Sequence, residues 1–367
     1  MIDVPKLSSI SISLFGRTVG QLALTPDNLC AFQYDSEFVR GGFSISPLKL
    51  PLGEQLFVAG RHPFGGGFGI FDDSLPDGWG KLVQDRFLRA GGIEPDRLSI
   101  LQRLAVVGTH GRGALEYMPN FELMDMPCDS GAASGIDALS AQAAEMLETS
   151  GAAGEDYSEM YRFGGSSGGA RPKVFYIDGD GEWLVKFRSS DDPKNMGTIE
   201  YETSLLAKEC GIDMPETKLF GEGHFGVRRF DRTKSGKVHV ASAAGLLHAD
   251  YRAPSLDYSG LLALCRIITR NMKDVEQLFL RMVFNIVIEN RDDHAKNFAF
   301  LMDKRGEWRL APAYDIVPSY GFGGYHTTVV NGSGKPTYAD MLAVAASAGL
   351  SAKKAREIIS RVEETCA

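Results

Sequence analysis

Residues 275–289, VEQLFLRMVFNIVIE, constrain the fold more than any other part of this 367-residue chain. As a helix, this stretch would carry apolar residues around nearly its whole circumference, so we expect it to be buried on all sides. Asp274 is the expected N-cap. Only a sizeable domain can surround such a helix, and a hydrophobic content of 44% is ordinary for a globular chain. At about 150 residues per domain, the length predicts two domains or two lobes.

Charge and cysteine usage exclude several classes of protein. The 39 Lys and Arg against 47 Asp and Glu give a formal charge of −8, and no segment forms a basic stripe. A general nucleic-acid or membrane-surface binder is therefore not expected. No apolar run approaches the roughly 18 residues of a membrane span, and the first residues, MIDVPK, do not resemble a signal peptide. Five scattered cysteines without a CxxC pair favour a reducing, cytoplasmic location.

The N-terminal part of the chain is rich in predicted strands. Residues 8–24 alternate with period two and predict a β-hairpin. One helix is expected over 78–92, and two short strands around a Gly-rich turn are expected within 104–119. We therefore expect a strand-rich N-terminal subdomain over 1–125.

The composition changes after this subdomain. A linker rich in Ala, Gly, Ser and Asp is expected over 126–156, with one short helix around 136–147. A kinase N-lobe-like region with a Gly-rich loop is expected over 157–235, followed by a helical C-terminal lobe over 236–367. The last part of that lobe predicts two helices.

The segment 290–297, NRDDHAKN, follows the buried helix directly. Asp292 and Asn297 have the spacing of the Asp and Asn in the kinase catalytic loop H-R-D-x-x-x-x-N. Phosphoryl transfer needs a carboxylate to accept the proton of the incoming hydroxyl, and oxygen ligands for the metal that bridges the phosphates. A predicted hairpin over 298–315 then places Asp315 at the end of its second strand. In kinases a metal-binding aspartate occupies that place in the order.

The upstream elements occur in the kinase order as well. A Gly-rich loop, FGGSSGGARP (163–172), precedes two predicted strands, and Lys186 lies on the second of these, WLVKF. A predicted helix follows and carries Glu200 and Glu202. These two glutamates lie about 200° apart on a helix, so only one can pair with Lys186, and Glu200 is the expected partner. Glycines in the loop allow backbone N–H groups to approach phosphates.

With these motifs in order, the chain resembles the HipA family of bacterial serine/threonine-protein kinases, the toxins of HipA–HipB toxin–antitoxin pairs. The resemblance covers nearly the whole length and rests on GIFDDSLPDGWGKLVQDR (69–86), VVGTHGRGALEYMP (106–119), SSGGARPK (166–173), LLAKECG (205–211), RRFDR (228–232), NRDDHAKNF (290–298) and LAPAYDIVPS (310–319). It implies an α+β, protein-kinase-like two-lobed fold, with a strand-rich N-terminal subdomain and a helical C-terminal lobe.

The resemblance also implies roles for individual residues. Asp292 would be the catalytic base, Asn297 and Asp315 would hold Mg²⁺, and Lys186, paired with Glu200, would hold the phosphates of ATP. The backbone around Arg229 and Phe230 would contact adenine, with Asp231 near the ribose. The loop residues that would surround the phosphates are Gly165, Ser166, Ser167, Gly168, Gly169 and Ala170.

The sequence leaves the roles of several residues open. His294 either assists the transferring phosphate or orders the loop. Ser166 matches the serine that such kinases autophosphorylate, but Ser167 adjoins it, so either serine could be the modified one. The best-known form of the family has glycine where this chain has Asp293, which adds a charge beside the proposed base. It also has glutamate where this chain has Arg228, in the hinge that would contact adenine.

The sequence therefore predicts an ATP- and Mg²⁺-dependent protein kinase toxin. A HipB-like helix-turn-helix antitoxin and a protein substrate, with an aminoacyl-tRNA synthetase as one family example, are the implied partners, and DNA would be contacted mainly through the antitoxin. The alternatives are a small-molecule kinase on the same scaffold and a catalytically idle co-repressor. The strand-rich subdomain favours the toxin over the small-molecule kinase. The joint presence of Lys186, Asp292, Asn297 and Asp315 argues against an idle scaffold.

Overall fold

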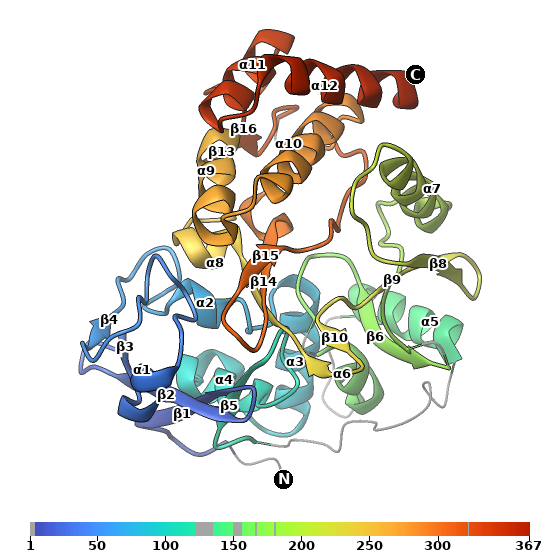
Figure 1. Cartoon of the computed structure of the whole chain (residues 1–367). Helices are drawn as coiled ribbons and strands as arrows, with labels where there is room; N and C mark the ends of the chain where they lie inside the picture. Colours follow the sequence, from blue (N-terminus) through green and yellow to red (C-terminus); the bar gives the residue numbers. More distant parts are fainter. Residues whose placement is uncertain (1–3, 122–134, 150–155, 166, 180, 322) are drawn as a thin grey trace. The chain divides into compact units, whose positions relative to one another are not determined.

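The computed structural model describes residues 4–121, 135–149, 156–165, 167–179, 181–321 and 323–367 (Figure 1). The chain divides into two compact units. The first, unit 1, consists of Met1–Phe43, Leu52–Tyr201 and Glu216–His239, and the second, unit 2, consists of Ser44–Pro51, Glu202–Pro215 and Val240–Ala367. Residues 126–134 and 150–155 of the linker expected over 126–156 lie outside the described residues, but its expected helix is present as α5 (Gly135–Glu148).

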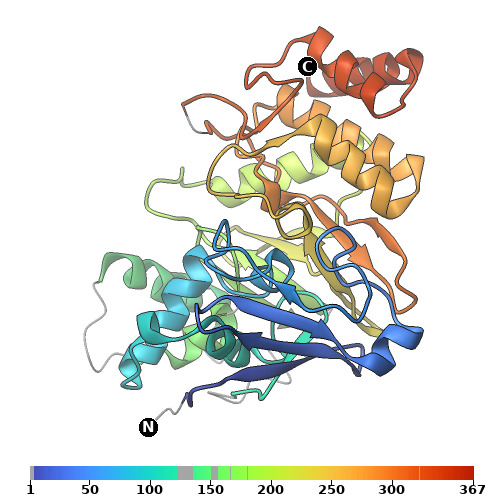
Figure 2. The same cartoon turned by 90° about the vertical axis from the view of Figure 1, so that its left-hand side faces the viewer.

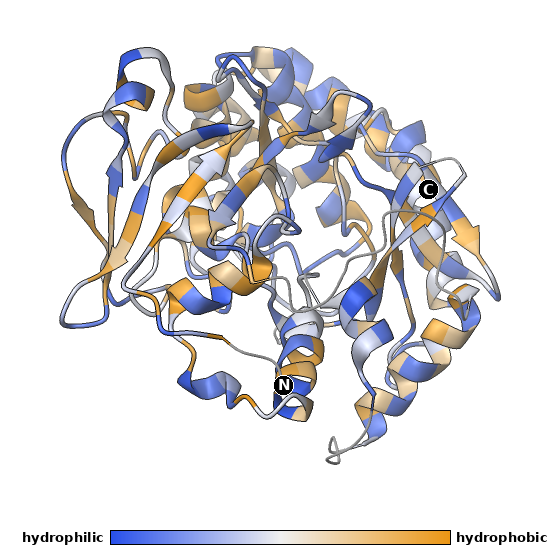
Figure 3. Ribbon diagram, turned by 90° about the horizontal axis from the view of Figure 1, so that it is seen from below, coloured by the Kyte–Doolittle hydropathy of each residue, from blue (hydrophilic) through white to orange (hydrophobic). Residues whose placement is uncertain are grey.

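Unit 1 contains a five-stranded antiparallel sheet with the order β4-β3-β2-β1-β5. The strands are β1 (Ser9–Leu14), β2 (Arg17–Leu24), β3 (Cys30–Tyr34), β4 (Phe57–Val58) and β5 (Leu115–Met118). Ile10, Ile12 and Leu14 are buried while the serines between them are more exposed, so the period-two pattern correctly predicts the first hairpin. Figure 2 shows these strands side by side, and Figure 3 shows hydrophobic and hydrophilic residues alternating along the strands.

Helices follow and interrupt this sheet. The expected helix is present as α3 (Gly78–Ala90), but the first of the two strands expected within 104–119 is wrong. That stretch belongs to the helix α4 (Ile100–Val107). Ser99 and Gln102 form a capping box at its start, and this local cap outweighs the strand preference of the two valines at its end. Two shorter helices, α1 (Ser36–Gly41) and α2 (Gly69–Asp72), complete this part.

A second antiparallel sheet in unit 1 has the order β6-β7-β9-β8. Its strands are β6 (Lys173–Asp178), β7 (Gly181–Lys186), β8 (Thr217–Phe220) and β9 (His224–Arg228), and the helices beside them in sequence are α6 (Ser158–Gly164) and α7 (Met196–Glu209). The strands and the helix expected here are therefore confirmed. Trp79 and Val83 of α3 share one hydrophobic core with Val174, Trp183 and Val185 of this sheet. The N-terminal subdomain and the Gly-rich region are thus packed as a single body within unit 1.

Unit 2 is mostly helical. It contains α8 (Ala243–Leu247), α9 (Tyr258–Thr269), α10 (Met272–Val287), α11 (Tyr338–Ser347) and α12 (Ala352–Cys366), so the two C-terminal helices are as expected. Helix α10 is buried around its circumference, as its sequence predicts. Its N-cap is Asn271 and not Asp274, because the Asn271 side chain accepts the N–H of Lys273, while the Asp274 carboxylate accepts the N–H of Leu310. Within the described parts of the chain, no helix combines the length and hydropathy that crossing a membrane requires.

Short strands complete unit 2. The sheet β12-β14-β15 consists of β12 (His239–Ser242), β14 (Ala299–Met302) and β15 (Trp308–Leu310), while β13 (Leu256–Asp257) pairs in parallel with β16 (Thr328–Val329). The hairpin predicted after the Asp/Asn segment is therefore present as β14 and β15. Its second strand ends at Leu310, because Pro312 has no N–H with which to continue the ladder. Asp315 consequently lies beyond the strand, in left-handed backbone with a φ of 57°, and the expectation that it ends the strand is wrong.

Candidate active site

The Gly-rich segment lies against the start of α3. The N–H of Trp79 donates to the carbonyl of Gly169 at 2.9 Å, and the N–H of Gly169 donates to the Asp77 carboxylate. The indole N–H of Trp79 also donates to the carbonyl of Lys173 at 2.9 Å. The segment is therefore held at several points by the PDGWG motif, and Trp79 is the packing anchor of this contact.

Glycines in α3 make this close approach possible. A Cβ atom at Gly80 would lie 1.9 Å from the carbonyl oxygen of Ser167, and one at Gly78 would lie 2.5 Å from that of Gly169. Gly169 has a φ of +88°, which an L side chain rarely adopts. Asp77, Gly78 and Gly80 are not among the predicted site residues, and in the sequence only the Gly-x-Gly spacing around Trp79 could indicate them.

The expected phosphate-loop residues differ in their exposure. Gly165 and Ser167 are buried, and the Ser167 hydroxyl donates to the carbonyl of Gly164 at 2.7 Å. Gly168, Gly169 and Ala170 are exposed, so their backbone is the part of the loop that faces solvent. Ser166, the expected autophosphorylation site, lies outside the described residues.

Lys186 and Glu200 form a buried ion pair. The Lys186 Nζ lies 2.8 Å from Oε2 of Glu200, and their side chains are 8% and 5% exposed. The second Glu200 oxygen lies 3.2 Å from the guanidinium of Arg171, which also pairs with Asp192 at 2.9 Å. Glu202 is exposed, so the geometry selects the expected glutamate of the two. A buried carboxylate between two cations holds Lys186 in one position.

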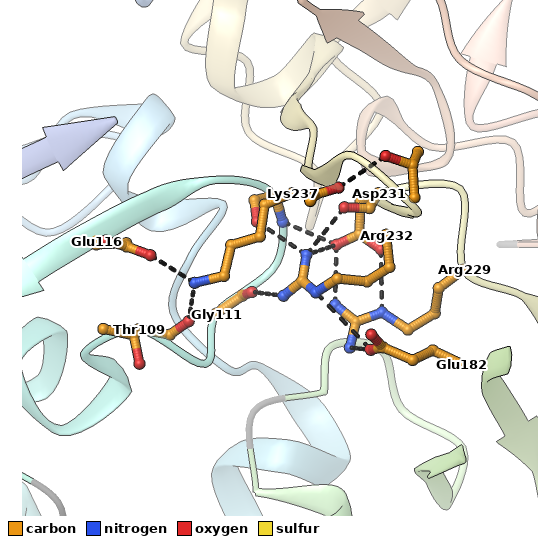
Figure 4. A network of polar contacts seen from close by, with 11 residues as sticks. Thr109, Gly111, Glu116, Glu182, Arg229, Asp231, Arg232 and Lys237 are labelled. Atoms are coloured by element: carbon orange, nitrogen blue, oxygen red, sulfur yellow. Dashed lines mark hydrogen bonds and ion pairs between the residues drawn. The ribbon is translucent and has the colours of Figure 1, made fainter. Parts of the chain in front are cut away.

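Asp231 in the hinge-like segment lies at the centre of a polar network (Figure 4). Its carboxylate accepts Nε of Arg229 at 3.0 Å, NH1 of Arg232 at 2.9 Å and the backbone N–H of Gly113 at 2.9 Å. Burial by itself would raise the pKa of Asp231, but these guanidinium groups and the N–H outweigh it and hold the pKa well below its usual range. A ribose contact of this side chain stays a prediction, and it would have to compete with these bonds.

The same network binds the end of the N-terminal subdomain to the hinge-like segment. Arg232 donates to the carbonyls of Gly111 and Gly113, each at 2.9 Å. Lys237 donates to the carbonyl of Thr109 and to Glu116, at 2.5 and 2.6 Å (Figure 4). Arg232 lies on the short strand β10 (Arg232–Thr233), and Lys237 lies on its partner β11 (Gly236–Lys237). The RFDR motif is therefore fixed by residues more than a hundred positions earlier in the chain.

Arg229, expected beside the adenine, is committed to the same network. Its guanidinium lies 4.2 Å from the centre of the Phe175 ring, and its backbone N–H donates to the carbonyl of Glu182 at 3.0 Å. Arg228, which stands where the family's best-known form has glutamate, pairs with Glu216 at 2.6 Å. Both arginine side chains therefore already have partners within the protein, which an adenine contact would have to replace. Phe230, the next residue, is half-buried.

The Asp/Asn segment of unit 2 forms a closed loop after α10. The Asp292 side chain is exposed, its N–H donates to the Ser319 hydroxyl at 2.9 Å, and its carbonyl accepts Nδ2 of Asn297 at 2.8 Å. The structure thus brings the two residues of the predicted pair together. Nδ1 of His294 accepts the N–H of Lys296 at 3.2 Å and caps a short 3-10 turn, which favours the loop-ordering role for His294.

Asn297 and Asp315 both offer oxygen ligands. The amide nitrogen of Asn297 is used by the bond to Asp292, which leaves the amide oxygen as the group that can face a cation. Carboxylate and amide oxygens suit Mg²⁺, which proteins hold with one or two side chains and the phosphates of the ligand. Among the described residues, no three His, Cys, Asp or Glu gather in a way that could hold a metal by themselves. The donor set therefore fits Mg²⁺ bound together with a nucleotide.

Two proteins of Sinorhizobium fredii, named "Putative kinase Y4dM" and "Putative kinase Y4mE", are 28% and 26% identical to this chain. The first alignment covers 86% of this chain and 78% of the relative, and the second covers 84% and 76%.

A solved structure shares the fold. It is described as the Shewanella oneidensis MR-1 toxin–antitoxin system HipA, HipB and its operator DNA complex, and it matches with a TM-score of 0.71 at 18% identity. The match covers 97% of this chain and 88% of that chain. Residues 10–118 match the model of the HipA N-terminal domain, and residues 165–367 match that of the HipA-like C-terminal domain. Since the second model alone spans more than half of the chain, the chain belongs to the HipA family.

Proposed function

We propose that this chain is an ATP- and Mg²⁺-dependent serine/threonine-protein kinase that acts as the toxin of a toxin–antitoxin pair. The buried ion pair of Lys186 and Glu200 carries the proposal. In protein kinases a strand lysine paired with a helix glutamate holds the nucleotide phosphates. Two such charges would be costly to bury for packing alone. The names of the relatives from Sinorhizobium fredii support the same activity.

In the proposed reaction, the exposed carboxylate of Asp292 accepts the proton of the attacking serine or threonine hydroxyl. Two hydrogen bonds hold the backbone of Asp292 in place: its N–H donates to the Ser319 hydroxyl, and its carbonyl accepts the side-chain amide of Asn297. The amide oxygen of Asn297 and the carboxylate of Asp315 would hold Mg²⁺, which when bound neutralises charge on the phosphates. Lys186 is the residue of unit 1 to which we assign the phosphates of ATP.

The Gly-rich segment is proposed to contact the phosphates through the exposed backbone of Gly168 and Ala170, since the N–H of Gly169 already donates to Asp77. A serine of the loop is also the proposed site of autophosphorylation. Ser166 is favoured over Ser167, because the Ser167 hydroxyl is buried and already donates to the carbonyl of Gly164. Phosphorylation of Ser167 would first require the loop to leave α3.

A HipB-like helix-turn-helix antitoxin is the proposed partner, with DNA contacted mainly through it. The match along 97% of this chain to a structure described as a HipA, HipB and operator DNA complex supports this. The net charge of −8 agrees with a chain that does not bind DNA by itself. A protein is the proposed substrate.

Incubation with ATP labelled in the γ-phosphate, Mg²⁺ and a cell lysate tests the activity. Wild-type protein should label serine or threonine in itself and in a lysate protein, and EDTA should abolish the labelling. Asp292→Ala and Lys186→Met should lower the rate by at least about 10²-fold. Asp27→Ala and Lys304→Met, which alter exposed residues of the same types, are the matched controls. Wild-type turnover in Asp292→Ala, or label only in small molecules, would contradict the proposal.

A further inference from the structure

We propose that Asp293 is a positioning residue, which through a chain of buried polar side chains fixes both Asp292 and the segment that carries Asp315. The inference rests on the proposed function, because it assigns these residues to the phosphoryl-transfer reaction. Asp293 departs from the glycine of the family's best-known form. Its sequence position suggests a second charge beside the proposed base. In the structure, however, the Asp293 carboxylate is buried, whereas Asp292 is exposed.

Asp292 and Asp293 are adjacent, yet their side chains have opposite environments. Asp292 is exposed, while Asp293 is 0% exposed. The Asp293 carboxylate accepts the hydroxyl of Tyr258 at 2.9 Å and the backbone N–H of Thr328 at 3.1 Å, and lies 3.0 Å from Nδ1 of His326. Its carbonyl also accepts the Thr328 hydroxyl. A buried carboxylate with this many partners has one favourable orientation, and it turns the peptide so that Asp292 faces outward.

A continuous series of hydrogen bonds leads from Asp293 back to Asp292. The Tyr258 hydroxyl, which donates to Asp293, accepts Nδ2 of Asn285 at 3.1 Å. The Asn285 amide oxygen accepts Nδ2 of Asn290 at 3.0 Å, and the Asn290 amide oxygen accepts the Ser319 hydroxyl at 3.0 Å. The Ser319 oxygen in turn accepts the N–H of Asp292 at 2.9 Å. Every group in the series thus has a consistent role as donor or acceptor.

Burial makes this series stiff. Tyr258 is 0% exposed, Asn285 is 3% exposed and Asn290 is 2% exposed. Burial and the neighbouring Asp293 carboxylate raise the pKa of Tyr258 well above its usual value, so its hydroxyl keeps the proton that it donates. If one member turned away, another buried polar atom would lose its partner, which costs about 1–3 kcal/mol. The members therefore hold one common arrangement.

Ser319 extends the series to the segment after Asp315. Asn290 and Ser319 form an isolated parallel β-bridge, and the N–H of Ser319 donates to the carbonyl of Glu289 at 3.1 Å. Gly321 continues this contact, since a Cβ atom there would lie 2.5 Å from the Cβ atom of Arg291. One hydrogen-bond network within unit 2 therefore fixes the positions of both the loop that carries Asp292 and the segment that follows Asp315.

The test removes one hydroxyl from the network and one from a matched site. Tyr258→Phe deletes the donor to Asp293. Tyr117→Phe is the control, because Tyr117 is also fully buried and its hydroxyl donates to the Ser74 hydroxyl at 2.7 Å, in unit 1. For each variant we would measure the melting temperature, kcat, KM for ATP, and hydrogen exchange of peptides covering 289–298 and 311–321.

We expect both variants to lose similar thermal stability. Tyr258→Phe should lower kcat by about 10- to 100-fold, the effect of a small misplacement of reacting groups, with a smaller change in KM for ATP. Both peptides should exchange hydrogen faster in Tyr258→Phe than in the wild-type protein. In Tyr117→Phe their exchange rates should be unchanged. Asp293→Asn, which keeps one acceptor oxygen, should retain more activity than Asp293→Ala.

Equal kcat in the two tyrosine variants, or unchanged exchange of both peptides in Tyr258→Phe, would overturn the inference. Failure of the proposed function has a different signature. In that case the wild-type protein transfers no phosphate, while the exchange measurement still tests whether Tyr258 couples the two segments.

Discussion

Glu200 lies between two cations, with Oε2 at 2.8 Å from Nζ of Lys186 and Oε1 at 3.2 Å from the guanidinium of Arg171. Because Arg171 lies within the Gly-rich loop (163–172), Glu200 connects that loop to the strand of Lys186. Arg171 is further anchored by Asp192, which accepts the N–H and hydroxyl of Ser189. The position of the proposed phosphate-binding lysine thus depends on contacts from several parts of unit 1.

Glu200→Gln should therefore destabilise unit 1 and weaken catalysis. The substitution keeps the size of the side chain but removes the charge shared by two cations, and breaking a buried pair typically costs on the order of 3–5 kcal/mol. Urea unfolding should show this loss, and KM for ATP should rise. Glu202→Gln is the control, because it makes the same change at an exposed position of the same helix. Equal effects of the two substitutions would show that the ion pair does not position Lys186.

Gly80→Ala should displace the Gly-rich segment from α3. The new methyl group would lie 1.9 Å from the carbonyl oxygen of Ser167, so the loop must move. Overpacking of this kind typically costs about 1–3 kcal/mol, and we expect KM for ATP to rise about tenfold. Gly260→Ala in α9 is the matched control, since nothing lies within 4 Å of a Cβ atom there. An unchanged KM in Gly80→Ala would remove the assigned role of the contact.

Asp231 should make stability depend on pH in the acidic range. Its pKa is lower in the folded protein than in the unfolded chain, so its stabilisation is complete above the unfolded value of about 3.9 and is lost as the pH falls towards the folded-state pKa. Asp231→Asn should therefore be less stable than wild type near neutral pH, and the difference should shrink below about pH 4. Denaturant unfolding from pH 2 to 7 measures this.

The control for this prediction is Asp27→Asn, which changes an exposed aspartate. Its stability should stay close to wild type throughout the range. A difference between wild type and Asp231→Asn that is the same at pH 3 and pH 7 would show that the charge of Asp231 does not carry the network.

Autophosphorylation should place one phosphate on Ser166. A phosphoserine carries about −1.5 to −2 charges, so it would compete with ATP phosphates at the loop and lower nucleotide affinity. Mass spectrometry after incubation with Mg-ATP should find the phosphate between Gly165 and Gly168. It should be absent in Ser166→Ala and Asp292→Ala and retained in Ser167→Ala. A phosphate elsewhere, or unchanged ATP binding by the modified protein, would leave the loop as a phosphate contact without a regulatory role.

Local sequence patterns correctly predict much of the fold. The first hairpin, the buried helix α10, the strands β6 and β7 and the two C-terminal helices follow from hydrophobic periodicity. Helix geometry allows only one of Glu200 and Glu202 to pair with Lys186, and the expected one, Glu200, forms the pair. The errors are local as well: a capping box at Ser99 starts the helix α4 where a strand is expected, and Pro312 ends β15 before Asp315. In both cases a local signal, a helix cap or a proline, outweighs the strand pattern on which the expectation rests.

The sequence by itself determined the order of the kinase-like motifs and the residues that can perform phosphoryl-transfer chemistry, because both depend on residue type and spacing. Only the tertiary structure decided that Asp292 faces outward and Asp293 inward, and that Gly113 closes the network of Asp231. It also decided that Asp77, Gly78 and Gly80 shape the Gly-rich segment. The physical reason is that these contacts join residues distant in the chain. A side chain's direction then depends on which buried partners satisfy its charge and hydrogen bonds, and periodicity does not encode those partners.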